Sequence, residues 1–238
     1  MTQSHNLVLL PGLLCDAALW RHQLDHLKDI AAMTVADLTQ ESSITAMAER
    51  VLDLAPKRFC LAGLSMGGYV AQEIMRLAPE RVERLALIDT NARADNAEQT
   101  KARRDLIRLA EIGTFKGVTP RLLPSLIHPT RMEDPDVAGV VMEMAERVGQ
   151  DAFKRQQEAI LNRKDGREDL VFVRIPTLVL AGRQDALCPP KVQEEMSSRI
   201  TGGRLILIED CGHLAPLERP YATSAVMRYW LGEPRTQH

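Results

Sequence analysis

The chain has 238 residues, a formal net charge of −2 and a hydrophobic content of 45%. This length suits one large α/β domain or two small ones, and the apolar content is enough for a sizeable core. The near-neutral charge, with a pI of about 6.3, favours neither nucleic acid nor an anionic membrane surface as a partner. We therefore expect a globular protein whose partner is a small molecule. Its oligomeric state cannot be read from the sequence.

The start of the sequence and the cysteines bear on where the protein works. The N-terminal residues include no basic segment, and the first apolar run, 7–10, is short, so we expect neither a signal peptide nor a membrane span. The cysteines lack the Cys-x-x-Cys spacing of a zinc site. We interpret them as reduced thiols in a cytoplasmic protein and expect no metal site. They are Cys15, Cys60, Cys188 and Cys211.

Short apolar runs alternate along the chain with segments of helical length, which is typical of a parallel sheet with crossover helices. Most of these runs are continuous, as expected for strands that helices cover on both faces. We predict strands at 7–10, 33–36, 59–62, 85–88, 177–181 and 205–208. We predict crossover helices at 19–27, 44–54, 68–77, 191–199 and 221–231.

The alternation is interrupted between 89 and 175, where the patterns are helical. Asp95 or Asn96 could cap a helix that ends at Gly113. Asp134-Pro135 is typical of a helix start, with Gly149 as the end, and 151–163 would form a third helix.

We therefore predict a doubly wound α/β fold with a mostly parallel sheet of about six strands and a helical lid inserted after the fourth strand. Residues 1–90 and 171–238 would form the core, and 91–170 the lid. Such an insert would cover the carboxyl edge of the sheet, where ligands bind. A purely structural elaboration is the alternative.

Ser65 lies in the most informative motif, Gly63-Leu64-Ser65-Met66-Gly67. The motif follows an apolar run and precedes a predicted helix, which is the context of a nucleophile elbow. In such a turn the serine adopts a strained backbone conformation that exposes its oxygen. The flanking glycines lie where strand and helix nearly touch, so a Cβ would clash there. A structural turn serine is the alternative interpretation.

A serine hydroxyl needs a base, and the base needs an orienting carboxylate. Asp185 follows the predicted strand 177–181, and His213 follows the strand 205–208. Because carboxyl ends of parallel strands meet at one edge of a sheet, we expect Ser65, Asp185 and His213 to converge there. Alternatively, Asp185 could be a turn cap and His213 a surface residue. Asp210 and Glu209 are rival orienters, although both lie very close to His213 in sequence.

Acyl transfer also needs hydrogen-bond donors for the developing oxyanion. We predict the backbone N–H groups of Met66, after the nucleophile, and of Leu13, in the loop after the first strand. Leu13 is preferred to Leu14 for this role. The apolar residues of the predicted lid suggest an apolar roof for the substrate pocket, although most of them could be helix core. The pocket candidates are Leu14, Phe115, His128 and Met142. A solvated loop histidine is the alternative for His128.

The sequence resembles the α/β-hydrolase fold superfamily over nearly its whole length, within which it looks like the small esterases and lactonases with a helical cap. The resemblance is carried by Leu9-Leu10-Pro11-Gly12, by Gly63 to Gly68, by Pro176 to Asp185 and by Gly212 to Pro220. It implies a cap domain after the fourth strand predicted above. Pro11 differs from the histidine that many members of the superfamily carry at this position, which suggests a differently stiffened oxyanion loop.

We expect a serine hydrolase that cleaves a small carboxylic ester, lactone or thioester through an acyl-enzyme, with no metal or organic cofactor. The same three residues could instead support carbon–carbon bond hydrolysis, peptidase activity or cofactor-free perhydrolase chemistry. A non-catalytic small-molecule receptor on the same fold is the alternative from a different class.

Overall fold

The computed structural model describes residues 5–113, 115, 117–118 and 122–232. Its centre is one six-stranded sheet in the order β2-β1-β3-β4-β5-β6, in which all neighbouring strands run parallel. The predicted α/β fold class is thus confirmed, and each predicted strand overlaps an observed one. The strands are β1 (His5–Leu10), β2 (Ala31–Val35), β3 (Phe59–Leu64), β4 (Val82–Ile88), β5 (Thr177–Gly182) and β6 (Arg204–Ile208).

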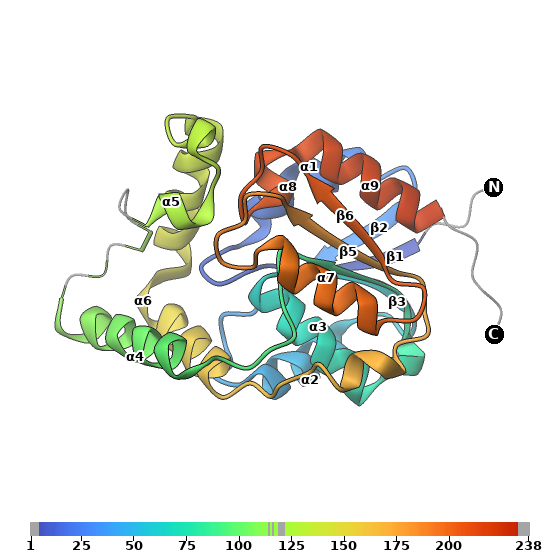
Figure 1. The fold of residues 1–238 in the computed structure, drawn as a ribbon, viewed down its shortest axis with the longest axis horizontal. Coiled ribbons are helices and arrows are strands. Elements are labelled where there is room, and N and C mark those ends of the chain that lie inside the picture. The colour runs from blue at the N-terminus through green and yellow to red at the C-terminus, as the bar shows by residue number, and fades with distance from the viewer. Residues whose placement is uncertain (1–4, 114, 116, 119–121, 233–238) are drawn as a thin grey trace.

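Helices cover both faces of the sheet (Figure 1). α1, α8 and α9 lie on one side, and α2, α3 and α7 lie on the other. Of the described helices, none has both the length and the apolar character needed to cross a membrane. The flanking helices are α1 (Arg21–His26), α2 (Ile44–Leu54), α3 (Met66–Leu77), α7 (Pro190–Arg199), α8 (Ala215–Glu218) and α9 (Pro220–Gly232). Short single turns are η1 (Ala17–Trp20), η2 (Pro79–Arg81), η3 (Pro129–Arg131), η4 (Pro135–Gly139) and η5 (Asp169–Phe172).

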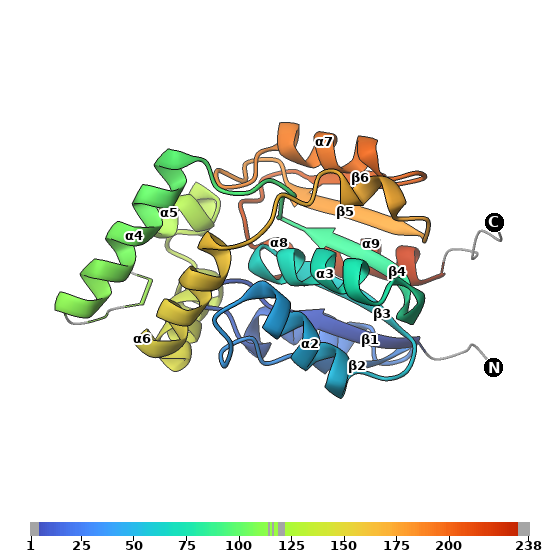
Figure 2. The ribbon, with the colours of Figure 1, turned by 90° about the horizontal axis from the view of Figure 1, so that it is seen from below.

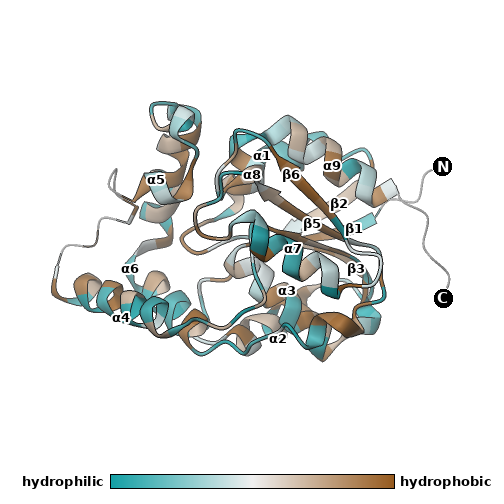
Figure 3. Ribbon diagram, viewed as in Figure 1, coloured by the Kyte–Doolittle hydropathy of each residue, from teal (hydrophilic) through white to brown (hydrophobic). Residues whose placement is uncertain are grey.

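The continuous apolar runs fill two cores, one on each face of the sheet. Because successive side chains of a strand point to opposite faces, Leu7 and Leu9 of β1 belong to one core and Val8 and Leu10 to the other. The first core includes Trp20 and the buried apolar side chains of α9. The second includes the buried faces of α2 and α3. Figure 3 shows the hydrophobic colour along β5, all of whose residues are buried, and along the edge strand β6.

β4 begins at Val82, three residues before the predicted strand. The prediction was too short because charged residues interrupt the apolar run at this point. Arg84 is 3% exposed and its Nη1 donates to the carbonyl oxygen of Trp230 at 3.1 Å. The guanidinium group thus reaches the end of α9 from within the sheet. Because arginine usually lies at the surface, the prediction omitted the first residues of this central strand.

The segment between β4 and β5 contains α4 (Ala97–Ile112), α5 (Leu123–Leu126) and α6 (Val140–Leu161). These helices group together at one end of the molecule, beyond the flanking helices (Figures 1 and 2). α4 ends before Gly113 as predicted, and its cap is Asn96, which forms a reciprocal capping box with Gln99. At Gly149 the backbone turns to φ 78°, so the predicted end is a kink within α6.

Candidate active site

Ser65 is the turn between β3 and α3, and its backbone is strained. Its φ is 52° and its ψ is −114°, in a region that side chains rarely adopt. Its N–H donates to the carbonyl oxygen of Ile88, and its own carbonyl oxygen accepts the Thr90 hydroxyl at 2.7 Å. A Cβ on Gly67 would meet the carbonyl oxygen of Leu10, so only glycine fits there.

The structure brings Ser65, His213 and Asp185 together. The Nε2 of His213 lies 2.8 Å from the Oγ of Ser65, and its Nδ1 lies 2.8 Å from the Oδ2 of Asp185. The other oxygen of Asp185 accepts the backbone N–H groups of Leu187 and Cys188. Asp185 and His213 are each 3% exposed. One nitrogen of the imidazole thus faces the hydroxyl while the other faces a carboxylate fixed by its own loop.

The rival orienters lie elsewhere. Glu209 pairs with Arg183 at the surface, and Asp210 pairs with Arg219. Of these three carboxylates, the one in contact with the imidazole is therefore that of Asp185.

The environment of His213 favours its protonated form. Burial by itself would lower the pKa of the imidazole, but the charge and hydrogen bond of Asp185 outweigh it and raise the pKa above its ordinary value. Asp185 would therefore stabilise an imidazolium that forms on His213 by proton transfer.

Asp89, directly after β4, binds the end of β5, which leads to Asp185, and the start of α8, which follows His213. Its Oδ1 accepts the N–H of Gly182 at 2.8 Å, and its Oδ2 accepts the N–H of Ala215 at 3.0 Å. Burial and the nearby charge of Asp185 raise the pKa of Asp89 to about 8. Sequence analysis missed this residue, although an acidic residue directly after a buried strand was a usable signal.

Glu218 fixes the loop that carries His213. Its side chain is fully buried and accepts the N–H groups of Gly212, Leu214 and His128 at 3.1, 3.0 and 2.7 Å. The N–H of His213 itself donates to the carbonyl oxygen of Leu126, at the end of α5. The histidine loop is thus held from both the core and the inserted segment.

The loop after β1 contains two neighbouring backbone N–H groups that differ in their hydrogen bonding. The N–H of Leu14 donates to the Oε1 of Gln156 at 3.1 Å, and Leu14 has a φ of 59°. Within the described part of the chain, the N–H groups of Leu13 and Met66 have no hydrogen-bond partner. That pattern agrees with the preference for Leu13 over Leu14, and the donor role of Leu13 and Met66 stays a prediction. The link between Leu14 and Gln156 was not foreseen.

Ser65 and His213 open into a cavity of about 460 Å³, a size that suits a small organic ligand. Core residues and residues of α4, α5 and α6 line it together. The lining is largely apolar and includes two of the predicted pocket residues, Leu14 and Phe115. It also includes Arg103 and Gln157, which sequence analysis did not single out.

Two other pocket candidates lie outside this lining. The ring of His128 contacts the hydroxyl of Thr130, and its N–H donates to Glu218, so the residue serves the histidine loop. Met142 is half-buried and packs against the core on another side of α6. Both assignments were therefore wrong for this cavity. The helix face that meets the site follows from tertiary packing, which the sequence pattern does not specify.

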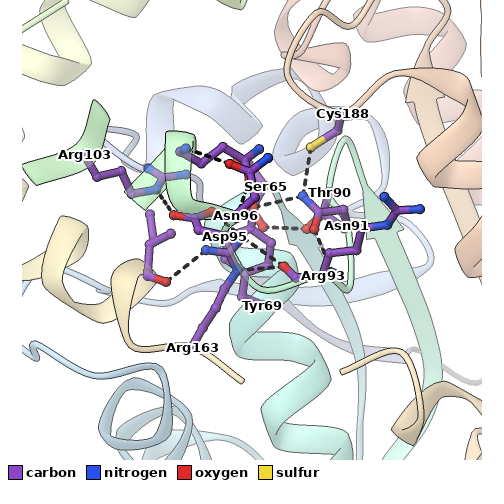
Figure 4. A network of polar contacts seen from close by, with 12 residues as sticks. Ser65, Tyr69, Thr90, Asn91, Arg93, Asp95, Asn96, Arg103, Arg163 and Cys188 are labelled. Carbon is purple, nitrogen blue, oxygen red and sulfur yellow. Dashed lines mark hydrogen bonds and ion pairs between the residues drawn. The ribbon is translucent and has the colours of Figure 1, made fainter. Parts of the chain in front are cut away.

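A polar network lies beside the elbow (Figure 4). Asp95 is the carboxylate at its centre, bonded to Arg163 Nη2 at 2.7 Å and to Arg103 Nε at 2.6 Å. Burial by itself would raise the pKa of Asp95, but the two guanidinium groups hold it below its ordinary value. Arg163 also lies over the ring of Tyr69, 4.3 Å from its centre. The network joins the inserted segment to the helix that follows Ser65.

All four cysteines are free and buried. Two groups of three described residues have metal-ligating atoms within 4.8 Å of one another: His5, Cys60 and Glu83, and Asp185, Cys188 and His213. In the second group, the imidazole and the carboxylate are already bonded to each other. Burial also raises the pKa of the Cys188 thiol, which disfavours the thiolate that a metal would need.

The sequence matches the alpha/beta hydrolase family over residues 7–226. The protein BpoC of Mycobacterium tuberculosis is 30% identical over 187 residues, which cover 77% of this chain and 71% of that protein. The pimeloyl-(acyl-carrier protein) methyl ester esterase of Nitrosomonas europaea is 26% identical over 235 residues, 90% of this chain and 91% of that protein.

Solved structures agree with this assignment. The thermophilic esterase of Thermogutta terrifontis, solved with malate bound, superposes with a TM-score of 0.86 at 28% identity. The match covers 97% of this chain and 90% of that one. The chain therefore belongs to the alpha/beta hydrolase family and is a hydrolase.

Proposed function

We propose that this protein is a serine hydrolase that cleaves a small carboxylic ester, lactone or thioester through an acyl-enzyme. The observation that carries the proposal is the pair of 2.8 Å contacts that join Ser65 to His213 and His213 to Asp185, where Ser65 and His213 line a largely apolar cavity. A serine flanked in this way is activated for attack on a carbonyl carbon.

In the first half of the reaction, His213 Nε2 takes the proton of Ser65 as its Oγ bonds to the carbonyl carbon. The N–H groups of Leu13 and Met66 would then bind the oxyanion. Asp185 holds the ring and stabilises the imidazolium. As the tetrahedral intermediate collapses, the bond to the leaving group breaks and His213 returns the proton to it.

The second half repeats these steps with water as the nucleophile. His213 takes a proton from the water, whose oxygen attacks the acyl carbon. The bond from that carbon to Ser65 then breaks, and the proton returns to Oγ. The reaction releases a carboxylic acid and restores the enzyme.

We also propose that residues 91–170 act as a cap over this site. Support comes from the cavity, whose walls combine Ser65 and Leu13 of the core with Phe115 and Phe153 of the inserted segment. An apolar roof would exclude bulk water from the acyl group and so strengthen the hydrogen bonds to the oxyanion.

Covalent labelling with a fluorophosphonate probe tests the nucleophile. We expect the wild type to be labelled and Ser65→Ala to be unlabelled. Ser125→Ala is the matched control, because Ser125 also lines the cavity but donates its hydroxyl to the carbonyl oxygen of Leu122. An unlabelled wild type, or equal labelling of Ser65→Ala, would overturn the proposal.

A further inference from the structure

The cavity beside Ser65 is largely apolar, but one of its lining residues carries a permanent charge. Among the described residues that line it, Arg103 is the only lysine, arginine, aspartate or glutamate. Its side chain is 23% exposed. A guanidinium group in an apolar cavity loses hydration, so its position there calls for an explanation.

The ion pair with Asp95 does not fully explain the position of Arg103, because Asp95 also pairs with a second arginine. The carboxylate bonds to Arg163 as well, and the Arg163 side chain is only 5% exposed. The other hydrogen bonds of Arg163 go to backbone carbonyl oxygens, those of Arg93 and Ile160. Two guanidinium groups thus meet one carboxylate, which leaves an excess positive charge, and Arg103 presents it to the cavity.

Arg103 and Gln157 together form a pair of donors. Arg103 Nη1 donates to the Oε1 of Gln157 at 2.8 Å, so the amide oxygen of Gln157 already has a partner. Within the described parts of the chain, Arg103 Nη2 and Gln157 Nε2 have no hydrogen-bond partner. Both residues line the cavity that contains Ser65. Free N–H donors with a positive charge match a carboxylate.

We infer that this cavity selects an ester, lactone or thioester that also carries a carboxylate, which Arg103 and Gln157 bind while the carbonyl carbon lies at Ser65. The inference rests on the proposed function and adds the substrate class to it. A purely structural ion pair between Arg103 and Asp95 is the competing account, and it predicts no discrimination between charged and neutral substrates.

The test compares monoethyl esters of dicarboxylic acids, from succinate to suberate, with their neutral ω-amides of the same length. We expect the wild type to prefer the acid over the amide in kcat/KM at the chain length that fits. Arg103→Gln should reduce that preference by roughly tenfold to hundredfold, the range expected for losing a hydrogen bond to a charged group. The readout is the ratio of the two kcat/KM values, which a general loss of activity would leave unchanged because it lowers the turnover of both substrates alike.

Two further variants sharpen the test. Gln157→Glu keeps the shape of the side chain but places a carboxylate beside Arg103, so it should also abolish the preference for the acid. Arg108→Gln makes the same change as Arg103→Gln on an exposed position of α4, where Arg108 pairs with Asp105, and should leave the preference unchanged. If the wild type turns over both substrates equally, or if both Arg103→Gln and Gln157→Glu keep the preference, the inference is wrong.

Binding separates this inference from the proposed mechanism. In Ser65→Ala, calorimetry should show tighter binding of monoethyl adipate than of ethyl adipamate, and adding Arg103→Gln should remove the difference. A difference without turnover or labelling in the wild type would reject the serine mechanism but retain the carboxylate site. Turnover of neutral esters together with equal binding of the two ligands would retain the serine mechanism but reject the carboxylate site.

Discussion

Glu218 positions His213 through the residues on either side of it. The carboxylate accepts the N–H groups of Gly212 and Leu214, the residues on either side of the histidine, at 3.1 and 3.0 Å. Because both neighbours bond to one buried side chain, the backbone of the histidine has little freedom to move. The imidazole therefore meets Ser65 from a fixed direction.

Glu218→Gln should weaken both folding and turnover. An amide group would face at least one backbone N–H with a donor instead of an acceptor, and an unsatisfied buried donor costs about 1–3 kcal/mol. We expect urea unfolding to show that loss, and ester hydrolysis to fall with it as the His213 loop shifts. Glu209→Gln, at an exposed ion pair in the same region, is the control and should change neither. Wild-type kcat in Glu218→Gln would show that the loop needs no such anchor.

Asp185→Asn should lower kcat by roughly 10³–10⁴-fold, because the asparagine cannot stabilise the imidazolium and favours the wrong tautomer of His213. Steady-state hydrolysis of a p-nitrophenyl ester measures this. Asp210→Asn tests the rival carboxylate beside His213. Asp210 is exposed and has a φ of 50°, which asparagine tolerates, so this variant should retain activity. A larger loss in Asp210→Asn than in Asp185→Asn would reassign the orienting role.

The pH dependence of kcat/KM should report the protonation of His213. Burial would lower its pKa, but Asp185 raises it above the ordinary 6.5. His213 must be neutral to accept a proton, so activity is lost as the pH falls through the pKa of His213 in the folded protein. We expect the midpoint of this acid limb above pH 6.5 in the wild type and at a lower pH in Asp185→Asn. A wild-type midpoint below 6.5 would contradict the electrostatic account.

Gln156→Met should impair the loop that carries Leu13. The substitution keeps the volume but removes the acceptor for the Leu14 N–H and the donor to the Leu38 carbonyl oxygen, each at 3.1 Å. We expect a stability loss of about 1–3 kcal/mol per unsatisfied group and a fall in kcat, since Leu14 at φ 59° would relax. Glu158→Gln, exposed on the same helix, is the control. An unchanged kcat would separate this hydrogen bond from the oxyanion site.

Gly67→Ala should destabilise the elbow far more than Gly139→Ala. A Cβ at Gly67 would clash with backbone atoms of Leu10 and Pro11, whereas at Gly139 it would meet nothing within 4 Å. Gly139 has helical dihedral angles, so alanine should be neutral or slightly stabilising there. We expect a loss of about 1–3 kcal/mol or more for Gly67→Ala by thermal unfolding. Equal stability of the two variants would contradict the close approach at the elbow.

Much of the fold could be predicted because its signals are local. The continuous apolar runs marked all six strands, and Ser43 caps α2 at the predicted start. β4 was shortened in the prediction because Arg84 finds its partner only on α9. The sequence predicts a helix end at Gly149, where the structure has a kink within α6. A glycine marks an interruption, but it does not show whether the helix continues afterwards.

The order of residues along the chain was enough to predict an α/β hydrolase fold and to nominate Ser65, Asp185 and His213. The reason is that strand ends and tight turns depend on residues that are neighbours in the sequence. Tertiary structure alone decided which partner each buried polar group meets. Gln156 binds the loop after β1, and Asp89 joins the end of β5 to the start of α8. It also decided that Arg103 faces the cavity while His128 and Met142 do not. These outcomes depend on how distant helices pack, and packing energy is set by contacts that no local pattern contains.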